Sequence, residues 1–138
     1  QADSALTNQA LAERAHVSPA TCLRRVRKLV DSGVIERQMA IVSPDALGIG
    51  LTAVLEVTLD LQTAEALAAF ESGISAEAAV QQCYRVASGP DFVLVVYVPD
   101  MAAYHAFVHR ALTAAGNVRN VRSFFSVKRS KFAPVLPV

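Results

Sequence analysis

The sequence is poor in cysteine and in aromatic residues, and it has no long hydrophobic run. Its two cysteines, Cys22 and Cys83, are too few for a disulfide framework and lack the spacing of a zinc site, so we expect reduced thiols in the cytoplasm. Aromatic residues make up 7% of a chain that is 53% hydrophobic, which predicts an aliphatic, alanine-rich core. No apolar run approaches the roughly 18–20 residues that a membrane-spanning helix needs, and no signal peptide is visible, so no membrane partner is expected.

The residue combinations on which enzymes depend are also missing. The sequence has no glycine-rich phosphate loop, no Cys–His arrangement and no convincing pair of carboxylates. His105 and His109 have the i, i+4 spacing of a metal pair, but they lie opposite the apolar stripe of their helix, and no Glu or Cys beside them offers a third ligand. We therefore interpret them as solvated and expect no enzyme activity, no catalytic residue, no metal and no cofactor.

The net charge is only +1, but the charged residues are unevenly distributed. Cations cluster in residues 24–28 and 119–131, whereas the acids lie mostly between Glu56 and Asp100. Such a patchy distribution suits a protein that meets DNA with one surface and another copy of itself with a second surface.

Residues 18–33 have the pattern of a basic amphipathic helix. Ser18 is placed to cap the helix, Pro19 suits the first helical position, and Gly33 suits the left-handed position after its end. Steps of about 100° per residue gather the apolar side chains on one face. That face consists of Cys22, Leu23, Val26, Leu29 and Val30, and the remaining surface carries Arg24, Arg25, Arg27 and Lys28. A basic helix face by itself is usually a solvated surface.

The residues before this helix favour a more specific interpretation. Residues 7–15 predict a short amphipathic helix capped by Thr7, and only residues 16–18 separate the two helices. This spacing is typical of a helix-turn-helix, whose second helix enters the major groove of double-stranded DNA, and residues 34–42 resemble the extended chain of a wing. The expected DNA contacts are Ser18, Ala20, Thr21, Arg24, Arg25 and Lys28.

A helix-turn-helix domain needs a third helix to cover the apolar sides of the other two. Residues 1–6 are too short to form it. We therefore expect a first helix upstream of this sequence, or one supplied in some other way.

In the second half of the chain the spacing of the apolar residues changes. Residues 43–50 are punctuated by proline and glycine and predict a linker. The predicted strands are residues 51–61, 80–87, 92–98 and 121–127, and the predicted helices are residues 63–70 and a stretch capped by Asp100. The order β-α-β-β-α-β is the ferredoxin-like arrangement, with both helices on one face of an antiparallel sheet. The expected fold is thus α+β. Its domains are an incomplete winged helix-turn-helix (1–42), a linker (43–50) and a ferredoxin-like effector-binding and oligomerisation domain (51–138).

The helix-free face of this sheet is expected to carry Val93, Val95 and Tyr97 at its centre, which is too apolar for open water. A second copy of the sheet is the simplest cover. A homodimer would also present two recognition helices to half-sites about 34 Å apart.

The chain resembles the Lrp/AsnC family of leucine-responsive and feast/famine transcription regulators over nearly its whole length. The motif residues that match are Asn8, Leu11, Ala12, Ser18-Pro19, Cys22-Leu23, Arg25 to Leu29 and Gly33 to Ile35, followed later by Val98 to Met101 and Tyr104. The resemblance implies one more helix before residue 1. It also implies homodimers that assemble further, often into octamers, and a response to amino acids.

The resemblance also implies an effector site at the loop between the second and third strands. The family pattern there is Thr/Ser-Gly-x-x-Asp, and the implied contacts in this chain are Ser88, Gly89, Pro90, Asp91 and, on the last strand, Ser123. Ser88 stands at the family's glycine position, and Val121 stands where the family often has the first threonine of Thr-x-Thr. The loop is either a tight turn alone or a turn that also binds an effector such as an amino acid.

Two functions follow from these alternatives. The first is a sequence-specific DNA-binding transcription regulator modulated by a small effector. The second is an effector-binding and assembly module that does not bind DNA.

Overall fold

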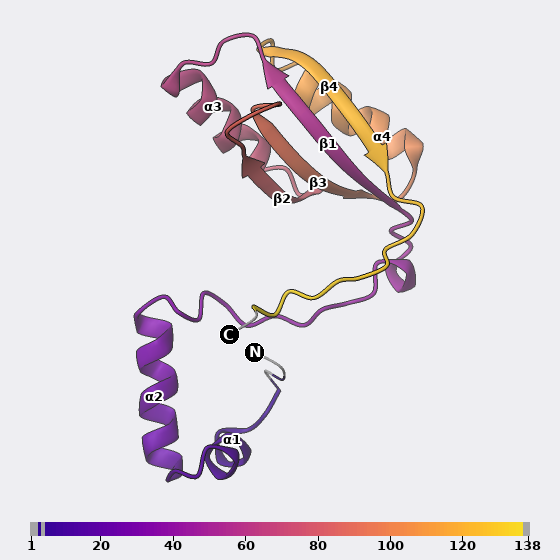
Figure 1. Cartoon of the computed structure of the whole chain (residues 1–138). Helices are drawn as coiled ribbons and strands as arrows, with labels where there is room; N and C mark the ends of the chain where they lie inside the picture. Colours follow the sequence, from indigo (N-terminus) through magenta and orange to yellow (C-terminus); the bar gives the residue numbers. More distant parts are fainter. Residues whose placement is uncertain (1–2, 4, 137–138) are drawn as a thin grey trace. The chain divides into compact units, whose positions relative to one another are not determined.

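The computed structural model describes Asp3 and residues 5–136, which form two compact units (Figure 1). The first unit comprises Gln1–Val42 with Lys131–Val138, and the second comprises Ser43–Ser130. The described residues 131–136 therefore group with the first unit, whereas the sequence assigns them to the second domain. Residues 126–136 form no helix or strand, although the Ser126 N–H still donates to the Thr52 carbonyl at the edge of the sheet. The domain boundaries 1–42, 43–50 and 51–138 stay a prediction.

The first unit contains two helices, α1 (Asn8–Arg14) and α2 (Pro19–Asp31). Both begin where the capping residues predict, because the hydroxyl of Thr7 accepts a hydrogen bond from the Ala10 N–H and that of Ser18 accepts one from the Thr21 N–H. Gly33 has φ +74°, a left-handed conformation that favours glycine directly after the helix. Residues 36–43 form neither helix nor strand.

The apolar face of α2 is less buried than its pattern predicts. Of its five apolar residues only Cys22 is buried, Val26 is half-buried, and Leu23, Leu29 and Val30 are exposed. The reason is geometric, because the contact between α1 and α2 buries Ala12 and Cys22 and leaves the rest of the face uncovered within the described residues.

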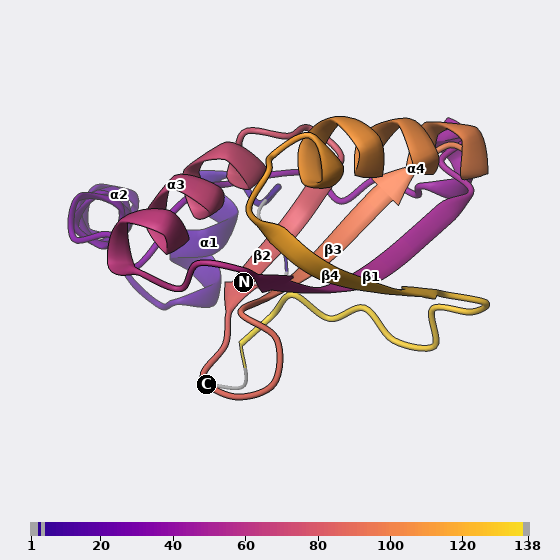
Figure 2. The same cartoon turned by 90° about the horizontal axis from the view of Figure 1, so that it is seen from above.

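The second unit is a four-stranded antiparallel sheet with helices on one face (Figure 2). Its elements are β1 (Leu51–Leu59), α3 (Ala64–Ser75), β2 (Val80–Arg85), β3 (Phe92–Val98), α4 (Met101–Phe107), η2 (Val108–Thr113) and β4 (Val118–Phe125). The strand order is β2-β3-β1-β4. This is the ferredoxin-like topology that the sequence predicts, which confirms the α+β fold. A short 3₁₀ turn, η1 (Asp45–Leu47), lies in the predicted linker.

The core lies between the sheet and the helices. Along β3, buried Phe92, Leu94, Val96 and Val98 alternate with half-buried residues. The helices contribute Phe70, Ile74, Phe107 and Leu112 to the same cluster. Because a strand presents alternate residues to opposite faces, this alternation leaves Val93, Val95 and Tyr97 on the helix-free face.

The structure differs from the sequence prediction in several element ends, and two of the differences concern the last helix and the last strand. The helix that Asp100 caps is α-helical only as far as Phe107 and continues as the π-helical η2. In η2 the Ala114 N–H donates to the His109 carbonyl. β4 begins at Val118 rather than Val121. Its early start has a visible cause, since the side chain of Asn117 both donates to and accepts from the backbone of Leu61 and thereby ties the preceding turn to the end of β1.

Candidate DNA-binding surface and effector loop

The beginning of α2 is held in place by side-chain hydrogen bonds from both helices. Ser18 caps the helix and also donates a hydrogen bond of 3.0 Å to the hydroxyl of Thr21. The side-chain amide of Asn8, in α1, donates a hydrogen bond of 2.9 Å to the Pro19 carbonyl. The angle between the helices is therefore constrained at the end of α2 that carries the predicted DNA contacts.

The predicted DNA-contact residues form one surface on α2. Ser18, Ala20, Arg24, Arg25 and Lys28 are exposed, and Thr21 is half-buried. Among the described residues, none of these cations takes part in an ion pair. A set of unpaired cations beside a helix N-terminus is suited to contact phosphates and base edges.

The structure adds Arg27 to this surface. Arg24, Arg27 and Lys28 line the same shallow groove along α2, together with Asp31. The sequence identifies Arg27 as basic but does not include it among the DNA contacts, because its helical angle lies toward the edge of the polar face.

The turn between the helices holds His16 in the left-handed region, at φ +51°. A residue other than glycine in this conformation is uncommon, although histidine adopts it more readily than most. Nothing in the sequence pattern marks this position.

We expect Asn8→Ala to loosen the helix pair. The lost bond to Pro19 should destabilise the pair by roughly 0.5–1.5 kcal/mol, the usual net contribution of one hydrogen bond. Amide hydrogen exchange in α2 measures this directly. Gln9→Ala is the matched control, because Gln9 bonds only within α1, to Glu13. Equal exchange rates in the two variants would show that Asn8 does not hold α2.

The candidate effector loop is tightly braced against the end of β1. The Asp91 carboxylate accepts hydrogen bonds from the Leu59 N–H at 2.7 Å and from the Gln62 side chain at 3.2 Å, both through Oδ2. The Asp91 N–H donates to the Val57 carbonyl, and its own carbonyl accepts from Val86. Asp91 therefore has a structural role that the sequence did not predict.

The exposed part of this loop has unused hydrogen-bonding groups. Ser88 and Gly89 are exposed, and Gly89 has φ +89°. Within the described residues, the backbone N–H groups of Ser88 and Gly89 and the Oδ1 atom of Asp91 have no hydrogen-bond partner. Donors and an acceptor thus lie on one loop whose Asp91 end is hydrogen-bonded to β1.

Ser123 does not join this loop within one chain. It lies opposite Leu55 in the β1–β4 ladder, on the face that the helices cover, and its hydroxyl shares a short hydrogen bond with the hydroxyl of buried Tyr104. Asp91 is bound four residues farther along β1, at Leu59, which corresponds to roughly 14 Å at 3.4 Å per strand residue.

Metal-site geometry is not seen in the described part of the chain. No group of three or more His, Cys, Asp or Glu side chains among residues 3 and 5–136 is placed to hold an ion. His105 and His109 are both exposed.

The half-buried Cys83 has its pKa raised by burial and by the nearby Glu71 carboxylate, which disfavours a reactive thiolate. None of the described helices combines the length and apolar character needed to cross a membrane.

Comparison with known proteins agrees with this two-part architecture. Residues 52–136 match the Lrp/AsnC ligand-binding domain, and residues 1–36 match a winged helix-turn-helix DNA-binding domain. The chain is 37% identical over 133 residues to a leucine-responsive regulatory protein of Rhizobium meliloti, covering 96% of this chain and 85% of that protein. It is also 37% identical over 131 residues to an uncharacterized HTH-type transcriptional regulator of Haemophilus influenzae, covering 95% of this chain and 78% of the other.

Solved structures show the same fold. An AsnC family transcriptional regulator from Agrobacterium tumefaciens superposes with a TM-score of 0.91 at 33% identity, covering 99% of this chain and 89% of that one. A transcriptional regulator from Neisseria meningitidis, solved as a complex with L-Met, superposes with a TM-score of 0.88 at 31% identity, covering 96% and 86%.

Proposed function

The chain belongs to the Lrp/AsnC family of transcription regulators, and from this premise we propose that α2 reads operator DNA while the loop of residues 88–91 binds an amino-acid effector. The observation that carries the DNA assignment is the exposed, unpaired set of cations on a capped helix that Asn8 holds to α1. The proposed contacts are Ser18, Ala20, Thr21, Arg24, Arg25 and Lys28. The protein acts in the cytoplasm and has no enzyme activity.

Base readout and phosphate contact can be separated by mutation. We expect Arg24→Ala or Arg25→Ala to weaken binding to the preferred site by roughly 1–3 kcal/mol more than binding to random DNA, the discrimination of one bidentate Arg–guanine contact. Lys28→Ala should weaken both alike and reduce the salt dependence by about one unit of slope, as loss of one phosphate contact does. Fluorescence anisotropy at several salt concentrations, on a site selected from a random DNA pool, measures both quantities.

Arg119→Ala is the matched control, because it removes a cation from the second unit, where Arg119 pairs with Asp60. Equal losses on selected and random DNA for all three α2 variants would exclude base readout by these residues. If the native chain binds no DNA at all, the protein is instead an effector-binding and assembly module.

The effector assignment is supported by the unused groups of the loop. Oδ1 of Asp91 can accept from the ammonium of an amino acid, and the N–H groups of Ser88 and Gly89 can donate to its carboxylate. Two relatives of known structure have methionine as their ligand, the Neisseria meningitidis regulator and a feast or famine regulatory protein of Mycobacterium tuberculosis. Ser123 lies far from Asp91 within one chain. Ser123 therefore contributes to the effector site only if its hydroxyl comes from another copy of the chain.

The partner of the sheet is a second copy of this chain. The helix-free face places Val95 between Val54 and Gln82, and Phe124 follows Val54 across the sheet. A dimer that buries this face leaves both helix layers outside and allows further assembly, such as an octamer. Because a ligand shifts such an equilibrium only by its differential affinity for the two assemblies, an effector bound at the loop can alter DNA binding by favouring one of them.

A further inference from the structure

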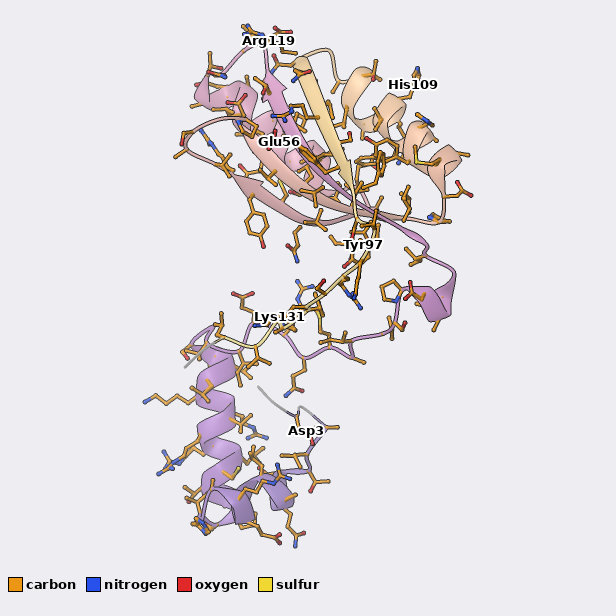
Figure 3. The ribbon with its side chains drawn as sticks, turned by 45° about the vertical axis from the view of Figure 1, so that its right-hand side comes forward. Asp3, Glu56, Tyr97, His109, Arg119 and Lys131 are labelled. Carbon is orange, nitrogen blue, oxygen red and sulfur yellow. The ribbon has the colours of Figure 1, made fainter. Side chains whose placement is uncertain are left out.

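An ion pair interrupts the apolar surface of the helix-free face. Glu56 of β1 lies directly opposite Arg122 of β4, and their side chains are joined by a 3.1 Å bond from Nη1 to Oε2. On its other side Glu56 lies opposite Val93, which in turn lies opposite Tyr84. Figure 3 labels Glu56 on its central strand.

On one side the pair neighbours the apolar side chains of Val54 and Phe124, and on the other side it neighbours Thr58 and Asn120. The Arg122 guanidinium lies 5.4 Å from the centroid of the Phe124 ring, and Phe124 lies opposite Val54. The Glu56 side chain is 31% exposed and that of Arg122 is 64% exposed, so both are still hydrated in the single chain. Covering this face with another sheet would remove much of that water.

Such a pair is a poor source of affinity. Exposed ion pairs stabilise little, and in a dry interface the loss of hydration offsets most of the attraction between the charges. Its effect on selectivity is larger, because a buried face that carries both signs of charge rejects any partner whose charges do not match it.

We propose that the Glu56–Arg122 pair selects the partner of the helix-free face, admitting a second copy of this chain and excluding related chains whose charges at these two positions do not match. This inference rests on the proposed dimer. In the native chain the two charges cancel, so two faces meet without net repulsion. Glu56→Arg gives a face of two cations, and Arg122→Glu gives a face of two anions.

The test uses these two variants and the double exchange Glu56→Arg/Arg122→Glu. Each single variant should have a dimer dissociation constant at least about 100-fold higher than the native chain, because like charges at short range in an interface repel strongly. An equimolar mixture of the two single variants should form a heterodimer, detected by native mass spectrometry with one chain carrying a mass tag. The double exchange should restore the homodimer to within about tenfold of the native dissociation constant.

Heterodimer formation also shows that both single variants are folded. If the single variants form homodimers as tight as the native one while Val95→Asp is monomeric, the face is the interface but the pair does not select the partner, and this inference is overturned. The same holds if the mixture stays monomeric. A native chain that is monomeric, or a Val95→Asp variant that still dimerises, would instead overturn the proposed dimer.

Discussion

Val95→Asp is expected to convert the proposed dimer into a folded monomer. Val95 lies on the central strand of the helix-free face, between Val54 and Gln82, and is half-buried even in the single chain. In the dimer the new carboxylate would be buried without a partner, at a cost of roughly 3–5 kcal/mol per uncompensated charge. Tyr97→Asp on the same strand should act in the same way.

Light scattering at micromolar concentration measures this effect, and circular dichroism checks that the variant is folded. Ala68→Asp is the matched control, because position 68 is exposed on α3, on the other side of the sheet. The control should remain a dimer. A native chain that is monomeric at micromolar concentration would contradict the prediction at once.

An amino acid present at 100 times its dissociation constant is expected to raise the free energy of unfolding of the native protein by about 2.7 kcal/mol. Asp91→Asn should remove most of this gain. The substitution keeps an oxygen that can accept from the Leu59 N–H, so the bracing of the loop survives while the charge that attracts the ligand ammonium is lost. Asp91→Ala removes both functions, and the difference between the two variants separates bracing from binding.

A thermal-shift screen of the amino acids against both proteins performs the measurement. Asp60→Asn is the control, because it removes an exposed carboxylate from the same end of the sheet, where Asp60 pairs with Arg119. Equal stabilisation of the native protein and Asp91→Asn would place the site elsewhere. If no amino acid stabilises the native protein at millimolar concentration, the loop is only a turn.

The elements that the sequence predicts correctly have local causes. Ser18 and Asp100 cap their helices through backbone groups three residues ahead, and β3 occupies residues 92–98 as its apolar run predicts. A cap or a period needs only neighbouring residues, so it is readable from the sequence alone.

The candidate DNA surface was predictable for the same reason, since its members share one helix face by spacing. Its bracing was not, because the bond from Asn8 to Pro19 joins two helices. The burial of the opposite face was not predictable either, because α1 covers only the part of it near Cys22.

The tertiary structure alone decided which distant residues meet. The family resemblance implies one site that contains Asp91 and Ser123, and this stays a prediction; within one chain, strand register sets Ser123 opposite Leu55 beneath the helices and binds Asp91 at Leu59. The same register brings Glu56 to Arg122, a pairing that no local pattern contains. Register depends on which backbone groups pair across strands that are far apart in the chain, and moving it by one residue exchanges the two faces of a strand. The sequence by itself determined the family, the elements and their faces, whereas the partners of each side chain depended on how the strands align.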